Sequence, residues 1–267
     1  MGLTGPGAEE GQETYNGIEL AAKQRKKILG HPIKLYVGDA PTPSQAITET
    51  KRLITTKNVL CILGSTTKGN AKAVPPICQK YGVPVLEFEW DPELTEQGWK
   101  RYFRIGQSYA VYVESVADRV VDYFAPMLGK KPEELRLAVV YDGWSKPVIK
   151  LLLDYLKEKY GIEPVYLSEN PWDTSDFTAV IEQLKAQEPI DIFLPEQIVL
   201  SAIIFRKQAI MLGFKPKITF GMGVGWGMPE FPDALGTKNV EGIFVYPWPI
   251  PEMNFKPARE FGEAYKK

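Results

Sequence analysis

Two kinds of hydrophobic pattern alternate along the chain, and this alternation occurs twice. Short runs rich in β-branched residues, such as NVLCILG at 58–64 and LRLAVVYDG at 135–143, are typical of buried strands. Longer stretches between them repeat apolar residues at the spacing of one helix face, as in residues 8–29. Strands that alternate with helices indicate parallel sheets with right-handed crossovers. We therefore predict an α/β fold of two doubly wound parallel-sheet lobes.

The first block predicts helices and strands in regular order. Thr42, Pro43 and Gln45 form a capping box that starts one of its helices. The predicted helices cover 8–29, the stretch from Pro43, the stretch from the 64–70 turn to Gln79, and 108–127; the predicted strands cover 31–37, 59–63, 83–88 and 101–105.

The second block repeats this order. Gly161 and Gly213 follow two of its helices, where a glycine commonly ends a helix. Thr174 or Ser175 is expected to cap the helix in DTSDFTAVIEQLKAQ. The remaining predicted elements are strands over 137–141, 163–167, 190–194, 217–220 and 242–246, and helices over 146–160, 198–212 and from 257 onward.

Composition excludes several classes of function. The chain has 267 residues, 44% of them hydrophobic and 24% charged, which is enough to bury a core. A net charge of −1 argues against a nucleic-acid partner, because phosphate neutralisation needs a basic face. No apolar run has the length that a bilayer requires. Cys61 and Cys78 are expected to be buried free thiols.

Catalytic motifs are weak throughout the sequence. GMGVGWG at 221–227 lacks the G-x-G-x-x-G spacing, and Pro147 stands where a nucleophile elbow after GWS needs glycine. The single histidine, His31, is distant in sequence from every candidate nucleophile, and one histidine with two separated cysteines does not suit a metal site. We expect a binding protein with no catalytic residue, no metal and no cofactor.

The two ends of the sequence lack features of a complete parallel domain. The chain starts as a loop directly before a helix and stops inside another helix, and it opens with no signal peptide. We therefore expect a chain truncated at both ends, or a gene fragment.

Several segments together resemble a known family. The segments TGPGAEEGQETYNGIELA, GHPIKLYVGDAPTPSQAITETKRLI and VLCILGSTTKGNAKAVPPICQKYGVPVLEF follow one another in the order found in type I periplasmic solute-binding proteins of the branched-chain amino acid (Leu/Ile/Val-binding protein-like) class. DPELTEQGWKRYFRIG, DFTAVIEQLKAQEPIDIFL and FRKQAIMLGF are similar to later elements of that class.

The resemblance implies a two-lobed receptor that closes about a hinge on its ligand. The lobes would be 1–107 plus 247–267 and 108–246, with the ligand cleft between them. It implies a small-molecule ligand and the membrane permease of an ABC importer as partners, a monomer, and a periplasmic or extracellular lipid-anchored location whose signal sequence is not in this chain. A ligand-sensing domain of a receptor or regulator is the alternative, and an enzyme on a doubly wound fold comes third.

Candidate ligand residues follow from where parallel strands end, because such sheets bind ligands outside their carboxyl ends. Ser65, Thr66 and Thr67 would offer hydroxyls and backbone N–H groups at a helix N-terminus, and they match the family's ligand loop; plain helix capping is the alternative. Glu89, beside Glu87 in EFEWDPELT, would attract a cation, unless both side chains are solvated at a strand end.

The other candidates come from the lobe crossing and the second block. Each has a plain alternative as a packing or surface residue. Glu89, Trp90, Trp144, Glu196 and Trp226 would together form an acidic, aromatic cage for a cationic or amide ligand. The candidates are Ser108 and Tyr109 at the crossing, and Trp144, Glu196 (or Gln197) and Trp226 in the second block.

Overall fold

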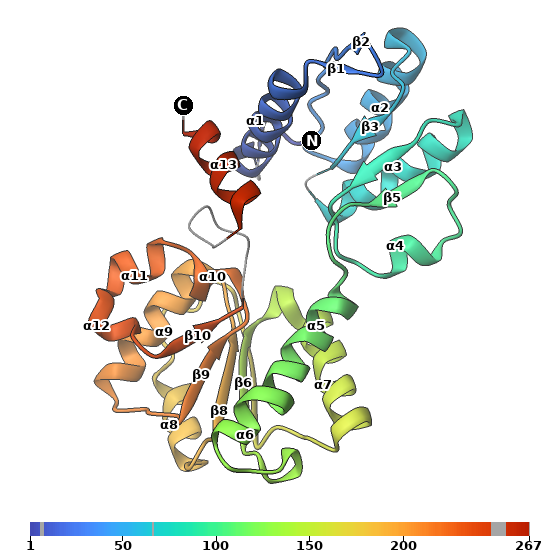
Figure 1. Ribbon diagram of the computed structural model, residues 1–267. Coiled ribbons are helices and arrows are strands. Elements are labelled where there is room, and N and C mark those ends of the chain that lie inside the picture. Colours follow the sequence, from blue (N-terminus) through green and yellow to red (C-terminus); the bar gives the residue numbers. More distant parts are fainter. Residues whose placement is uncertain (6–7, 66, 247–254, 267) are drawn as a thin grey trace. The chain divides into compact units, whose positions relative to one another are not determined.

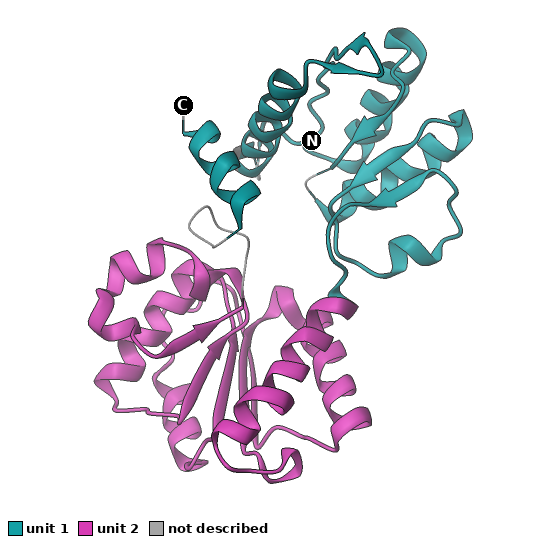
Figure 2. Cartoon of the chain, viewed as in Figure 1, with its two compact units in different colours: residues 1–109, 250–267 teal, residues 110–249 magenta. Residues whose placement is uncertain are grey.

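The computed structural model describes residues 1–5, 8–65, 67–246 and 255–266, which divide into two compact units (Figure 2). Unit 1 comprises residues 1–109 and 250–267, and unit 2 comprises residues 110–249. The boundaries between the units, after residues 109 and 249, lie two and three residues beyond the boundaries expected from the sequence, after residues 107 and 246. Each unit is described by itself below.

Unit 2 is built on a five-stranded parallel sheet in the order β10-β9-β8-β6-β7. All six residues of β6 are buried, because its neighbours β7 and β8 pair with both of its edges. Helices flank this sheet on both sides (Figure 1). The strands are β6 (Leu137–Asp142), β7 (Tyr166–Asn170), β8 (Ile192–Glu196), β9 (Ile218–Gly221) and β10 (Ile243–Val245).

The unit 2 helices mostly begin and end where the sequence predicts. Gly161 ends α7 with a φ of 67°, a conformation that glycine adopts readily. The helical segment predicted over 108–127 is continuous but contains a π-helical stretch at Arg119–Phe124. The helices are α5 (Tyr109–Asp118), α6 (Ala125–Met127), α7 (Lys146–Tyr160), α8 (Thr178–Ala186), α9 (Val199–Met211), α10 (Val224–Gly227), α11 (Glu230–Leu235) and α12 (Thr237–Val240), with 3-10 turns at Pro132–Glu134 and Gly143–Ser145.

Unit 1 has a smaller parallel sheet of three short strands in the order β3-β4-β5. Its helix α13 lies beside α1 (Figure 1), where the Tyr265 hydroxyl donates to the backbone oxygen of Glu13 at 3.3 Å. The elements are α1 (Ala8–Arg25), β1 (Lys27–Ile28), β2 (His31–Pro32), α2 (Pro43–Lys57), β3 (Ile62–Leu63), α3 (Lys68–Tyr81), β4 (Val85–Glu87), α4 (Glu93–Glu96), β5 (Tyr102–Arg104) and α13 (Lys256–Tyr265).

The N-cap at Thr42 is confirmed as the start of α2, whereas the Gln45 side chain accepts from the Thr42 hydroxyl at 2.6 Å, which is not the backbone bond of a full capping box. Thr42 has an extended backbone, its side chain accepts from the N–H of Gln45 at 3.4 Å, and Pro43 is the first helical residue. The pattern was reliable here because capping is a contact between residues three apart, so the sequence contains all of it.

The strand predicted over 31–37 is wrong. Only His31–Pro32 pairs, and it pairs antiparallel with Lys27–Ile28, which falls inside the predicted helix over 8–29. Lys26 and Leu29 have φ values of 58° and 50°, which end the helix in a tight turn. Alternation alone does not make a strand, because a ladder needs a hydrogen-bonded neighbour.

Three predictions in unit 2 also need correction. Helix α8 begins at Thr178 and not near Thr174 or Ser175, because Asp176 accepts from the N–H of Thr178 at 2.9 Å. Strand β7 starts at Tyr166 rather than at residue 163. The 221–227 segment, which the sequence did not assign to a helix, ends in the short helix α10.

Candidate functional site

Ser65 and Glu87 meet at the carboxyl ends of neighbouring strands β3 and β4. The Ser65 N–H donates to Glu87 Oε1 at 3.1 Å, and the Ser65 hydroxyl donates to Oε2 at 2.9 Å, with both side chains buried. Burial raises the pKa of Glu87, while these donors and the Phe88 N–H act in the opposite direction. The expectation that Glu87 is solvated is therefore wrong, and the Ser65 groups expected for a ligand are engaged by this carboxyl group.

The hydroxyl loop after Ser65 has a capping role. The Thr67 side chain accepts from the N–H of Asn70 at 3.4 Å, so Thr67 is the N-cap of α3. This corresponds to the structural alternative that the sequence left open. Thr66 lies outside the described residues.

An aromatic group borders Glu89 in unit 1. Phe88, Trp90 and Tyr109 form this unit 1 aromatic group, in which the Trp90 ring lies edge-on at 6.3 Å from Phe88 and 5.9 Å from Tyr109. The Tyr109 N–H donates to the Trp90 carbonyl oxygen at 2.9 Å, and the Trp90 N–H donates to Glu89 Oε1 at 3.0 Å. The structure thus gathers three of the predicted residues, Glu89, Trp90 and Tyr109, and Ser108 directly precedes Tyr109 in the chain.

The third acid of this loop is neutralised within unit 1. Asp91 forms an ion pair with Lys68, with 2.9 Å between Asp91 Oδ2 and Lys68 Nζ, and the Asp91 side chain is only 7% exposed. Burial alone would raise the pKa of Asp91, but Lys68 and the N–H of Glu93 hold it below its usual value. The Asp91 charge is therefore balanced by Lys68, and Glu89 is the acid of this loop that lies next to Trp90.

Two buried carboxyl groups mark the carboxyl edge of the unit 2 sheet. Asp142 ends β6, and its Oδ2 accepts from the N–H of Ile198 at 2.8 Å; burial raises its pKa to about 6. Glu196 ends the neighbouring strand β8, where it lies opposite Tyr141, and burial raises its pKa to about 8. The Tyr112 hydroxyl contacts Glu196 Oε2 at 2.9 Å.

The sequence named Glu196 as a candidate and did not single out Asp142 or Tyr112. Asp142 directly follows the buried run of β6, so its place at a strand end was a usable signal. Tyr112 lies on α5, 84 positions before Glu196, and no local pattern connects the two residues.

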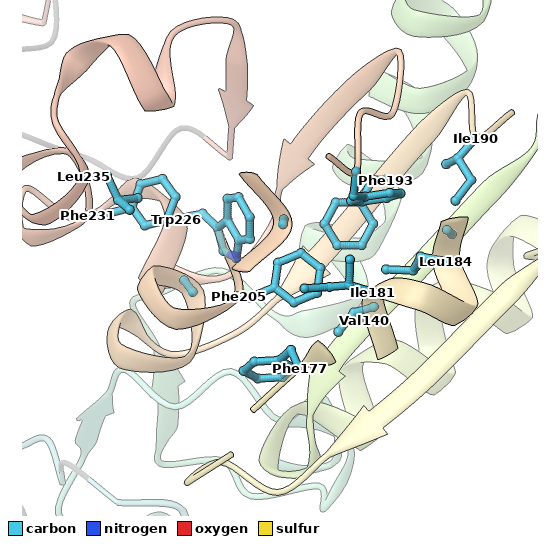
Figure 3. Close-up of a cluster of buried hydrophobic side chains, with 14 residues drawn as sticks. Val140, Phe177, Ile181, Leu184, Ile190, Phe193, Phe205, Trp226, Phe231 and Leu235 are labelled. Carbon is cyan, nitrogen blue, oxygen red and sulfur yellow. The ribbon is translucent and has the colours of Figure 1, made fainter. Parts of the chain in front are cut away.

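The two tryptophans predicted for unit 2 have different environments. Trp144 lies in the 3-10 turn after β6 and is 45% exposed. Trp226 is 3% exposed and packs in the core against Phe205 and Phe231, as Figure 3 shows. Its indole N–H donates to Gln197 Oε1 at 3.3 Å. We therefore leave Trp226 out of the ligand set.

Unit 1 also contains an apolar cavity of about 710 Å³. It lies between the unpaired 33–37 segment and strand β3, and helix α2 contributes Ala46 and Leu53 to its wall. Its volume is typical of small-molecule pockets. Its lining has few polar groups, however, and we place the candidate ligand site at the strand ends, where the acids and aromatic rings lie.

Metal and thiol chemistry find little support in the described part of the chain. No group of three His, Cys, Asp or Glu side chains there is arranged to hold a metal ion. Cys61 and Cys78 are free thiols, and burial raises the pKa of Cys78 to about 12, so it stays protonated.

No helix among the described residues has the length and hydropathy needed to span a membrane.

Comparison with known proteins places this fold. The model of the periplasmic binding protein family matches residues 1–267. Leu/Ile/Val-binding protein homolog 7 of Brucella abortus (strain 2308) is 30% identical over 274 residues, which cover 99% of this chain and 68% of that protein.

Two solved structures share the fold at low sequence identity. A putative branched-chain amino acid ABC transporter protein from Silicibacter pomeroyi has a TM-score of 0.84 at 20% identity, covering 99% of this chain and 68% of its own. A solute-binding protein of an ABC transporter from R. palustris, solved in complex with 4-hydroxybenzoate, has a TM-score of 0.69 at 21% identity, with coverage of 99% and 71%. The family match and the curated relative together show that the chain belongs to the periplasmic binding protein family.

Proposed function

We propose that this chain is the solute-binding receptor of an ABC importer, which captures a small polar molecule outside the cytoplasm and delivers it unchanged to a membrane permease. Family membership supports the receptor role. The observation that carries the proposal is the placement of acids and aromatic rings at the carboxyl ends of both sheets, where parallel α/β folds bind ligands.

The unit 1 aromatic group favours a cargo with a cationic, amide or aromatic part. Phe88 and Trp90 flank Glu89 in the chain and Tyr109 packs on Trp90, and aromatic rings together with a nearby carboxylate suit an amine or a flat ring. Both Ser65 donors are occupied by Glu87, which makes Ser65 a poor clamp for a ligand carboxylate. The relatives' names, one referring to Leu/Ile/Val and another to 4-hydroxybenzoate, support a cargo among amino acids and aromatic acids or amines.

Capture needs no covalent step. The ligand would bind through non-covalent contacts at the carboxyl ends of the parallel strands, and hinge closure, the mode expected of this family, would trap it. A ligand stabilises the closed form only through contacts that the open form lacks. The receptor would act as a monomer in the periplasm, or on the outer face of the cell through a lipid anchor.

A ligand panel tests both the receptor role and the cargo class. Thermal unfolding is measured with L-leucine, L-isoleucine, L-valine, 4-hydroxybenzoate, tyramine and L-phenylalaninamide. We expect the aromatic and amine compounds to raise the Tm more than the aliphatic amino acids. The strongest shift from an aliphatic amino acid would contradict the cargo class, and chemical conversion of any bound compound, seen by mass spectrometry, would contradict the receptor role.

A matched pair of variants tests the aromatic group. Trp90→Ala should raise the Kd of the best panel compound about twofold to thirtyfold, corresponding to about 0.5–2 kcal/mol for a cation or ring stacked on an indole. Tyr81→Ala removes an aromatic side chain that is 42% exposed at the far end of α3 in the same unit, and it should leave the Kd unchanged. If both variants change the Kd equally, Trp90 does not contact the ligand.

A further inference from the structure

The Tyr112 hydroxyl lies between two oxygen atoms at the carboxyl edge of unit 2. Glu196 Oε2 is 2.9 Å away, and the carbonyl oxygen of Met222, which follows β9, is 2.7 Å away. All three groups are buried. The hydroxyl thereby joins helix α5 to the ends of two strands that neighbour each other in the sheet.

The number of available protons fixes the direction of these hydrogen bonds. A hydroxyl has one proton, a carbonyl oxygen only accepts, and an ionised carboxylate also only accepts. If Tyr112 donates to Met222, the second short contact is a hydrogen bond only when Glu196 carries a proton and donates it to the Tyr112 oxygen. An ionised Glu196 would leave one of the two short contacts without a proton, in a place without solvent.

The surroundings of Glu196 also favour the neutral form. Its side chain faces Tyr112 from α5 and Asp142 from β6, and the Tyr246 ring after β10 lies 4.6 Å from that of Tyr112. Burial raises the pKa of Glu196 to about 8 against the opposing effect of the Tyr112 hydroxyl, and the nearby Asp142 carboxyl group adds to the rise. A buried carboxylate without a cation is costly.

The loop after β9 packs directly on Glu196. A Cβ atom at Gly223 would come within 3.2 Å of Glu196 Oε1 and within 2.8 Å of the Gln197 backbone. The loop is also held by backbone bonds from Met222 N–H to Pro195 oxygen at 2.9 Å and from Gly225 N–H to Gln197 oxygen at 3.1 Å. Glu196 therefore lies between the two backbone bonds that anchor the loop.

We propose that Glu196 is a positioning residue that is kept as a neutral acid. Its O–H donates to the Tyr112 oxygen and the Tyr112 O–H donates to the Met222 carbonyl, and this relay of two hydrogen bonds holds the 222–226 loop against the end of β8. Loss of that proton in alkaline solution breaks the relay and loosens this edge of unit 2. The proposal concerns the protein without ligand and stands apart from the cargo class.

Equilibrium unfolding as a function of pH tests whether Glu196 is protonated in the folded protein. An unfolded glutamate ionises near pH 4.5 while the folded one keeps its proton to about pH 8, so the unfolded state binds fewer protons in that window. The unfolding equilibrium constant should therefore rise about tenfold per pH unit between pH 5.5 and 7.5 relative to the Glu196→Gln variant. Glutamine keeps the relay, because its amide N–H donates to Tyr112, and it does not titrate.

Glu182→Gln is the matched control, since Glu182 is exposed on α8 and pairs only with Lys185 across one helical turn. It should keep the pH dependence of the native chain. If Glu196→Gln and Glu182→Gln show the same pH dependence as the native chain, Glu196 is ionised in the folded state and the proposal fails.

Hydrogen exchange tests the positioning role independently of any substitution. After correction for the intrinsic effect of pH, the Met222 and Gly225 amides of the native chain should exchange at least tenfold faster at pH 9 than at pH 6.5. The same amides in Glu196→Gln should show no such increase. Unchanged protection in the native chain across this range would overturn the proposal, even if Glu196→Gln fails to fold.

Discussion

The two units follow the same strand–helix order but differ in how well their first strands are paired. In unit 2, β6 precedes helix α7 and lies between β7 and β8, with every residue buried. In unit 1, the 33–37 segment forms no strand, and it lines an apolar cavity together with β3. A segment with an apolar pattern therefore forms a strand only where a neighbouring strand supplies backbone N–H and C=O groups for hydrogen bonds.

The difference extends to the cores. The unit 2 core contains stacked and edge-on rings, among them Phe193, Phe205 and Phe177 (Figure 3). The unit 1 core consists mainly of small and aliphatic residues, such as Ala71, Val74 and Val85. We expect unit 2 to hold its fold more strongly, and the following substitutions test this contrast.

The largest effect is expected from Phe193→Ala. Phe193 is 1% exposed and stacks on Phe205 at 5.2 Å, so its loss should cost unit 2 about 3–5 kcal/mol. Urea unfolding followed by hydrogen exchange assigns the loss to a unit. Phe103→Ala, at a phenylalanine that is 52% exposed on β5 of unit 1, is the control and should cost far less. Similar losses in both variants would contradict the contrast between the cores.

A smaller effect is expected in unit 1 from Ser65→Ala. The change removes the hydroxyl donor of Glu87 and leaves a buried carboxyl group short of one hydrogen bond, at a cost of about 1–3 kcal/mol at pH 7. Because burial raises the pKa of Glu87, the cost should shrink from pH 7 toward pH 5, as the folded carboxyl group moves toward its neutral form and depends less on the Ser65 donor. Chemical unfolding at the two pH values measures this difference.

Ser44→Ala serves as the comparison for that experiment, since Ser44 is exposed in the first turn of α2. It should change the unfolding free energy of unit 1 by less than about 0.5 kcal/mol at either pH. If the cost of Ser65→Ala is the same at both pH values, the Ser65 hydroxyl has no effect on the ionisation of Glu87.

The smallest effect is expected from filling the unit 1 cavity. Ala46 is 3% exposed on α2 and lines the cavity, so Ala46→Leu should stabilise unit 1 by about 1 kcal/mol through added apolar burial. Ala179→Leu on the exposed face of α8 adds the same atoms without a cavity and should be close to neutral. A lower Tm for Ala46→Leu would mean that the wall is too rigid to accept the side chain.

The sequence by itself determined the features that depend on nearby residues. The N-cap at Thr42, the glycine that ends α7 and the long buried run of β6 each lie within a few positions, so the α/β class and most helix ends follow from local physics. The match to the family rests on such elements occurring in the right order.

Only the tertiary structure decided which side chains meet. It buried Glu87 against Ser65, enclosed Trp226 in an aromatic core, and placed Tyr112 beside a glutamate 84 positions away. It also left the 33–37 segment without a ladder. Burial and strand pairing depend on partners that are distant in sequence, and a single sequence does not specify those distances.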